Sequence, residues 1–63
     1  MKGDDLRKIR NTLDWTTLKF GRQLGYEGKP TSVMTHVSAM ETGQRKIPRH
    51  VSIIAKMLLR LQE

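Results

Sequence analysis

The fold is decided by residues 16–49, whose sequence is TTLKFGRQLGYEGKPTSVMTHVSAMETGQRKIPR. This stretch predicts one helix over residues 16–24, closed by a left-handed cap at Gly25, and a second helix over residues 32–41. A polar loop separates the two helices, and the basic tract 43–49 follows the second one. The segments on either side are expected to complete one small domain around these two helices.

The segment before this stretch predicts an amphipathic helix over about residues 4–13. Asp4 and Asp5 stand at its start, where they can provide an N-cap and a favourable charge for the helix dipole. Trp15 and Phe20 then have the spacing of a hydrophobic staple around the start of the next helix. The apolar residues of the first helix that share one face are Leu6, Ile9 and Leu13.

Gly21 lies inside the helix predicted over residues 16–24. Glycine in a helix interior costs about 1 kcal/mol relative to alanine. We therefore expect another helix backbone to pass close to Gly21.

The last segment predicts a helix over about residues 48–61, with Pro48 as an early residue. One face is expected to pack on the domain: Val51, Ile54, Ala55, Leu58 and Leu61. Another face is expected to point outward: Ile53, Met57, Leu59 and Arg60. An exposed apolar strip on so small a protein favours a partner, and we expect a second copy of the chain. The residues expected at the dimer interface are Ile53, Met57, Leu58 and Leu61.

The 63 residues can form one domain at most, and a chain of this length buries only about 60% of the surface that its unfolded form exposes. It has no cysteine and no cluster of histidine and acidic residues at metal-ligand spacing, so we expect neither disulfides nor a metal. No apolar run approaches the roughly 20 residues needed to cross a bilayer, and the N-terminus lacks the apolar core of a signal peptide. We therefore expect a soluble, cytoplasmic protein without a membrane partner.

The chain is strongly basic, with twelve Lys and Arg residues against six Asp and Glu residues and a net charge of +6. Because these charges are grouped, a polyanionic partner is the first expectation. The alternative is that they only keep a small protein soluble. The sequence offers no nucleophile with a base and an orienting group, no carboxylate pair and no phosphate-binding glycine loop. We expect neither an enzyme nor a bound cofactor or small-molecule ligand.

Several short motifs follow one another along the chain, each weak alone. They are Leu6-x3-Arg10-x2-Leu13, Trp15-Thr16-Thr17, Phe20-Gly21-x2-Leu24-Gly25 and Val37-x2-Met40-Glu41-x-Gly43, with Pro48 five residues after that glycine. Their order and spacing resemble the Cro and phage-repressor type of helix-turn-helix, the XRE-like or lambda-repressor-like family. The resemblance implies a small all-α, four-helix domain in which the helix beginning near Ser32 enters the major groove of DNA. It also implies an internal ion pair between Arg10 and Glu41.

The chain departs from the family pattern in four respects. The turn between the two reading helices carries about six extra positions, which either lengthen the loop or add a turn to the recognition helix. Thr17 takes the place of a glutamine that usually braces the phosphate and the recognition helix, and Met40 stands where an aromatic residue is common. The long side chains that often read bases are replaced by Met34, Thr35 and Ala39.

Candidate DNA contacts fall into two groups. Those expected to meet base edges through methyl, hydroxyl or imidazole groups are Thr31, Ser32, Thr35, His36 and Ala39, with Thr31 or Ser32 also capping the helix. The resemblance implies that the start of the helix at Thr16 and the loop after Glu41 hold phosphates. The residues expected to do so, together with Lys29 of the enlarged loop, are Thr16, Thr17, Lys29, Thr42, Gln44, Arg45, Lys46 and Arg49. For each residue the alternative is a solvated polar surface, and for His36 a half-buried packing role is an equal alternative.

The sequence thus predicts a sequence-specific regulator that binds double-stranded DNA, in the form of a homodimeric repressor that occludes a promoter at an inverted repeat. Such stand-alone domains resemble the autorepressors of phages and mobile elements, including those associated with anti-CRISPR proteins. One alternative is an antitoxin-like interaction module whose apolar strip covers another protein. A second is a non-specific nucleic-acid binder driven by the net charge alone.

Overall fold

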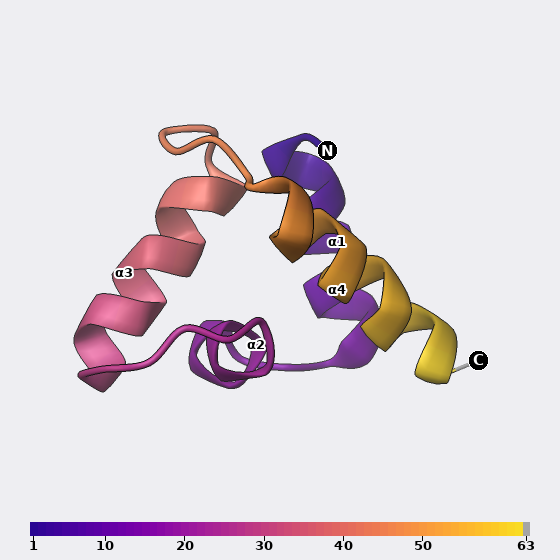
Figure 1. The fold of residues 1–63 in the computed structure, drawn as a ribbon, viewed down its shortest axis with the longest axis horizontal. Helices are drawn as coiled ribbons and strands as arrows, with labels where there is room; N and C mark the ends of the chain where they lie inside the picture. The colour runs from indigo at the N-terminus through magenta and orange to yellow at the C-terminus, as the bar shows by residue number, and fades with distance from the viewer. Residues whose placement is uncertain (63) are drawn as a thin grey trace.

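The computed structural model describes residues 1–62, and within them it contains four α-helices and no strand (Figure 1). The helices are α1 (Gly3–Leu13), α2 (Thr17–Gln23), α3 (Pro30–Glu41) and α4 (Arg49–Leu61). The predicted all-α, four-helix class is confirmed at this level. Within the same residues, no helix has the length and apolar content needed to cross a membrane.

The helices leave one long side of α3 uncovered. α2 packs chiefly against α3, and α1 contacts both α3 and α4. In Figure 1, α3 (pink) and α4 (orange to yellow) lie on opposite sides of the molecule, and α2 is viewed nearly along its axis between their lower ends. α3 therefore packs on the domain through one face only.

The core draws apolar side chains from all four helices. Its buried members are Leu6, Ile9, Leu13, Phe20, Leu24, Val33, Val37, Met40, Val51 and Ala55. Half-buried apolar side chains close it at the edges: Trp15, Tyr26, Ile47, Ile54, Leu58 and Leu59. On each helix the buried residues recur at helical spacing, so one core serves the whole domain.

The start of α2 is built as predicted. The Thr16 hydroxyl oxygen accepts a hydrogen bond from the backbone N–H of Lys19 at 3.2 Å, which confirms Thr16 as the N-cap. The rings of Trp15 and Phe20 lie 6.4 Å apart between centroids and are tilted to one another, as a hydrophobic staple requires. These contacts fix the direction in which the chain enters α2.

The start of α1 differs from the prediction, because Lys2 and not an aspartate occupies the N-cap position. Asp4 and Asp5 lie inside the first turn. From there the Asp5 carboxylate accepts a hydrogen bond from the backbone N–H of Lys2 at 3.3 Å. The aspartates therefore complement the N-terminal helix dipole, as expected, and Asp5 makes the capping-box hydrogen bond, although neither aspartate occupies the N-cap position.

The start of α3 also differs from the prediction. The helix begins at Pro30, two residues early, and Lys29 is its N-cap. Proline suits the first helical position, because its φ is fixed near the helical value and its missing N–H would have no partner there. Thr31 and Ser32 consequently lie within the first turn and do not cap the helix. Part of the extra sequence after α2 thus lengthens α3.

Gly21 is buried where α2 meets α3. A methyl group added at Gly21 would overlap the Val33 side chain and lie 2.9 Å from Cγ2 of Val37, whereas the Val33 carbonyl oxygen would be 3.8 Å away. The predicted close approach of α3 is present: its backbone comes within van der Waals contact, and the valine side chains come closer still. The missing side chain at Gly21 is what lets these valines reach α2.

The outward face of α4 was predicted only in part. Ile53 and Met57 are exposed, as expected, but Leu61, expected to pack inward, is 77% exposed. Leu59, expected to point outward, is half-buried against the core. Leu61 is the last residue of α4, whereas Leu59 lines the concavity that α1 and α4 form together. The exposed apolar face of α4 is therefore made of Ile53, Met57 and Leu61, and we call it the α4 strip.

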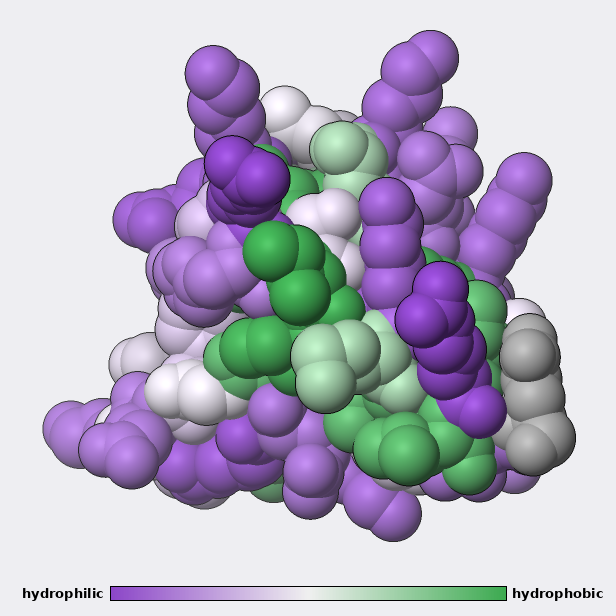
Figure 2. Space-filling view, turned by 45° about the vertical axis from the view of Figure 1, so that its right-hand side comes forward, coloured by the Kyte–Doolittle hydropathy of each residue, from purple (hydrophilic) through white to green (hydrophobic). Residues whose placement is uncertain are grey.

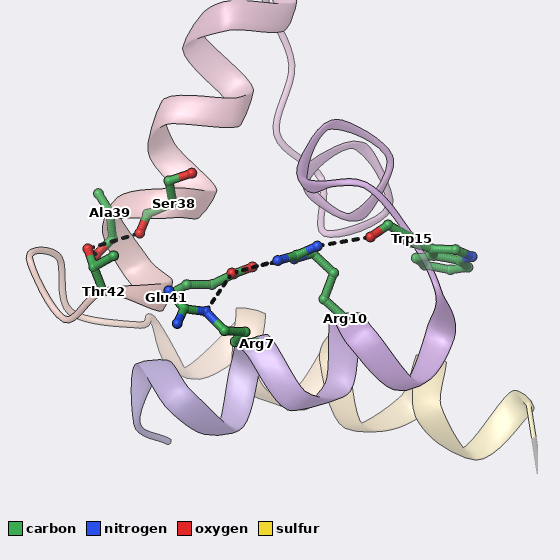
Figure 3. A network of polar contacts seen from close by, with 7 residues as sticks. All are labelled: Arg7, Arg10, Trp15, Ser38, Ala39, Glu41 and Thr42. Atoms are coloured by element: carbon green, nitrogen blue, oxygen red, sulfur yellow. Dashed lines mark hydrogen bonds and ion pairs between the residues drawn. The ribbon is translucent and has the colours of Figure 1, made fainter.

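A buried ion pair joins α1 to the last residue of α3 (Figure 3). Nε and Nη2 of Arg10 donate to the two carboxylate oxygens of Glu41 at 2.7 and 3.1 Å, and the Glu41 side chain is only 3% exposed. Nη1 of Arg10 donates to the carbonyl of Trp15 at 3.1 Å. The hydrogen bond to Glu41 raises the pKa of Arg10. The ion pair implied by the family resemblance is thus present, and it also braces the link between α1 and α2.

Arg7 provides a matched control for this pair. It approaches Glu41 with one contact of 3.5 Å, and its side chain is 47% exposed. Arg10→Ala leaves a buried carboxylate without its main partner and should cost about 3 kcal/mol of unfolding free energy. Arg7→Ala should cost less than about 1 kcal/mol. Urea unfolding followed by circular dichroism measures both, and equal losses would contradict the assignment of Arg10 as the main partner.

Candidate nucleic-acid interface

The uncovered face of α3 holds an open concavity of about 320 Å³. It is lined by Thr31, Ser32, Thr35, His36, Ala39 and Arg45, and we call it the α3 concavity. The first five are the residues predicted to meet base edges, and the sixth is one of the predicted phosphate contacts. The structure therefore brings all five base-reading candidates together beside a cation.

His36 forms one wall of the α3 concavity and is held there by Tyr26. The two rings lie 4.3 Å apart between centroids, and the Tyr26 hydroxyl donates to the sulfur of Met40 at 3.7 Å. Burial lowers the pKa of His36, and the nearby charge of Arg45 lowers it further. The imidazole is consequently neutral at pH 7, with one nitrogen to donate and one to accept a hydrogen bond. The half-buried packing role weighed for His36 is present, and its ring also lines the α3 concavity.

Arg45 reaches the α3 concavity because the chain folds back after α3. Gly43 has a positive φ of 85°, and the backbone N–H of Arg45 donates to the carbonyl of Ala39 at 3.1 Å. The charge of Arg45 lowers the pKa of His36 and opposes the burial that raises the pKa of Tyr26. The guanidinium is thus placed within electrostatic range of both rings.

The threonines predicted to hold phosphates differ in whether the hydroxyl proton is free to donate to a phosphate. The Thr42 hydroxyl donates to the carbonyls of Ser38 and Ala39 at 3.0 and 3.3 Å, so its proton is used within the helix end (Figure 3). The Thr16 oxygen accepts from Lys19 as an N-cap and keeps its proton free for a phosphate. Thr17 is half-buried at the start of α2. Thr16 is therefore better placed than Thr42 to donate to a phosphate.

The remaining phosphate candidates are exposed and lie outside the α3 concavity: Lys29, Gln44, Lys46 and Arg49. Lys29 directly precedes α3, and the others follow it. Positive charge thus stands at both ends of the helix that carries the base-reading candidates.

Two residues that support this face were not identified from the sequence. Tyr26 packs on His36, and Nη2 of Arg22 donates to the carbonyl of Gly28 at 2.9 Å. Both contacts involve the loop before α3, where no periodicity indicates which side chains meet. An aromatic residue in an otherwise polar loop is a usable signal for Tyr26, because such rings usually find a buried surface.

Within residues 1–62, no group of three or more His, Cys, Asp or Glu side chains is placed to hold a metal ion. A second concavity, of about 390 Å³, lies between α1 and α4. It is lined by Met1, Asp5, Lys8, Ile9, Lys56 and Leu59. Of the two, only the α3 concavity gathers side chains that the sequence predicts to bind a ligand.

Acidification should destabilise the fold partly through His36. Its pKa is lowered in the folded chain, so the unfolded chain takes up a proton first, and stability falls as the pH drops below about 6.5 toward the folded value. Urea unfolding of His36→Gln should therefore show a smaller loss of stability between pH 8 and acidic pH than the unsubstituted chain. His50→Gln, at an exposed histidine, should behave like the unsubstituted chain. Equal acid sensitivity of His36→Gln and the unsubstituted chain would contradict this role.

No protein-family model, curated protein or solved structure matches this chain. The α3 concavity and the charges around it are the features of the molecule that indicate a function.

Proposed function

We propose that the chain binds double-stranded DNA by placing α3 in the major groove, and that it regulates transcription by occupying a promoter. In this proposal α2 and α3 form a helix-turn-helix of the lambda-repressor-like kind. The observation that carries the proposal is the α3 concavity, where four short side chains and the His36 ring line one helix face beside Arg45. The major groove is about 12 Å wide and admits an α-helix, and short side chains let the helix backbone approach the bases.

The charges around α3 support the proposal. With 12 residues α3 is about 18 Å long, so cations at its two ends can meet phosphates on opposite sides of the groove. Lys29 precedes the helix, and Arg45, Lys46 and Arg49 follow it. A net charge of +6 adds long-range attraction to a polyanion.

We further propose that two copies of the chain associate through the α4 strip. Ile53, Met57 and Leu61 are spaced by four residues and are 48%, 57% and 77% exposed. Figure 2 shows the apolar surface on the side of the molecule that includes α4, bordered by hydrophilic side chains. A two-fold dimer presents two copies of α3, which matches an inverted repeat with half-sites separated by roughly 10 base pairs.

Selection of bound DNA from a random pool tests the proposal as a whole. We expect an enriched inverted repeat that outcompetes bulk DNA by at least roughly a thousandfold. If bulk DNA competes as well as the selected site does, the alternative of a non-specific binder is favoured, since the net charge is sufficient for such binding. Failure to bind any duplex at low ionic strength would refute DNA binding.

Arg45→Ala should weaken binding to every DNA sequence, because the lost side chain is expected to neutralise one phosphate. The slope of log K against log salt should fall in magnitude by about 0.9. Lys8→Ala removes one positive charge from the exposed surface of α1, away from α3 and the α4 strip, and serves as the control. Fluorescence anisotropy at several salt concentrations measures both slopes. If the two variants behave alike, Arg45 does not hold a phosphate.

Met57→Glu should convert the dimer to a folded monomer, because burying an unpaired carboxylate in an apolar interface costs several kcal/mol. Gln23→Glu introduces the same charge on the exposed surface of α2 and should leave the dimer intact. Sedimentation equilibrium gives the mass, and circular dichroism checks the fold. A dimeric Met57→Glu variant, or a monomeric unsubstituted chain, would exclude the α4 strip as a self-association surface. In the second case the antitoxin-like alternative, with another protein on the strip, becomes the better explanation.

A further inference from the structure

We infer that the α3 concavity recognises thymine through its C5-methyl group, so that the preferred DNA site is read mainly by apolar contact. This inference rests on the proposed function and specifies the base that the site selects. Thymine is the base that presents a methyl group in the major groove. Guanine, adenine and cytosine present only hydrogen-bonding groups there.

The composition of α3 excludes the side chains that usually read the other bases. Guanine is read mainly by Arg or Lys, and adenine by Asn or Gln, through paired hydrogen bonds. The whole of α3, Pro30–Glu41, contains none of these four residue types. Its acidic residue, Glu41, is buried in the ion pair with Arg10 and cannot accept from cytosine. Arg45 is the cation in the α3 concavity, and it comes from the turn after the helix.

Methyl groups follow one line along the α3 concavity. Thr31, Thr35 and Ala39 are spaced by four residues. Each threonine side chain includes a methyl group, and the alanine side chain consists of one. Four residues of helix rise about 6 Å, so the three positions span about 12 Å. At 3.4 Å per base pair this is the rise of about three to four pairs. One pass of α3 can therefore present methyl groups to several neighbouring thymines.

The polar groups of the α3 concavity complement this apolar line. The Ser32 hydroxyl and the neutral His36 imidazole can each donate to and accept from a base edge. His36 is held by Tyr26 and so meets the groove in a fixed orientation. These two side chains can fix the register of the helix on the DNA, while the methyl groups select thymine.

Replacing thymine by uracil tests the inference, since uracil keeps the pairing and the O4 acceptor and lacks only the methyl group. The probe is the site selected from the random pool, with uracil placed at one thymine at a time. At each contacted thymine we expect affinity to fall about fourfold, the effect of exposing one methyl group. Uracil at thymines outside the selected half-sites should have no effect and serves as the control.

Thr35→Ser assigns the contact to a residue, because it removes a methyl group and keeps the hydroxyl. In this variant the penalty for uracil should disappear at one thymine and persist at the others. Thr12→Ser makes the same change on the exposed surface of α1 and should leave every penalty in place. Anisotropy titrations give the affinities for each combination of protein and DNA.

Two outcomes separate this inference from the proposed function. If a specific site is selected and its uracil form binds within twofold of the thymine form, DNA recognition stands and thymine-methyl recognition is overturned. If no duplex is bound at low ionic strength, both are overturned.

Discussion

The contact between Arg10 and Glu41 is the constraint on which the rest of the structure depends. A carboxylate that is almost fully buried is tolerable only with a partner that supplies opposite charge and hydrogen bonds, and Arg10 supplies both. Because Glu41 is the last residue of α3, its pairing fixes the end of that helix against α1. Gly3 adds to this, since a side chain there would collide with the Met40 and Glu41 carbonyls. The turn that carries Arg45 starts from this fixed point.

The four helices could be predicted from the sequence because each repeats its apolar residues at helical spacing. The N-cap at Thr16 and the staple of Trp15 with Phe20 follow from local chemistry within a few residues. The helix ends were harder. The start of α3 follows from the local preference of Pro30 for the first helical position, a signal that apolar spacing does not report. The exposure of Leu61 depends on tertiary packing at the end of α4, which spacing within one helix does not report either.

The candidate site also combines features that the sequence predicts with features that it does not. One helix face determines which base-reading candidates lie together, so helical periodicity was sufficient to group them. The placement of Arg45 and the packing of Tyr26 on His36 were not predictable, because each requires a loop to return to α3. A positive φ at Gly43 makes one of these returns possible. Where a contact crosses a loop, its partners are set by tertiary packing and not by their spacing in the sequence.

The two faces of α3 are chemically independent. Val33, Val37 and Met40 are buried, while Thr31, Ser32 and Thr35 of the α3 concavity are exposed. Exchanges at Thr31 or Thr35 therefore remove little of the packing that stabilises so small a chain. Under the proposed DNA binding, descendants of this sequence could acquire new sequence preferences one substitution at a time and remain folded throughout. His36 is the exception, because its ring is shared between the surface and Tyr26.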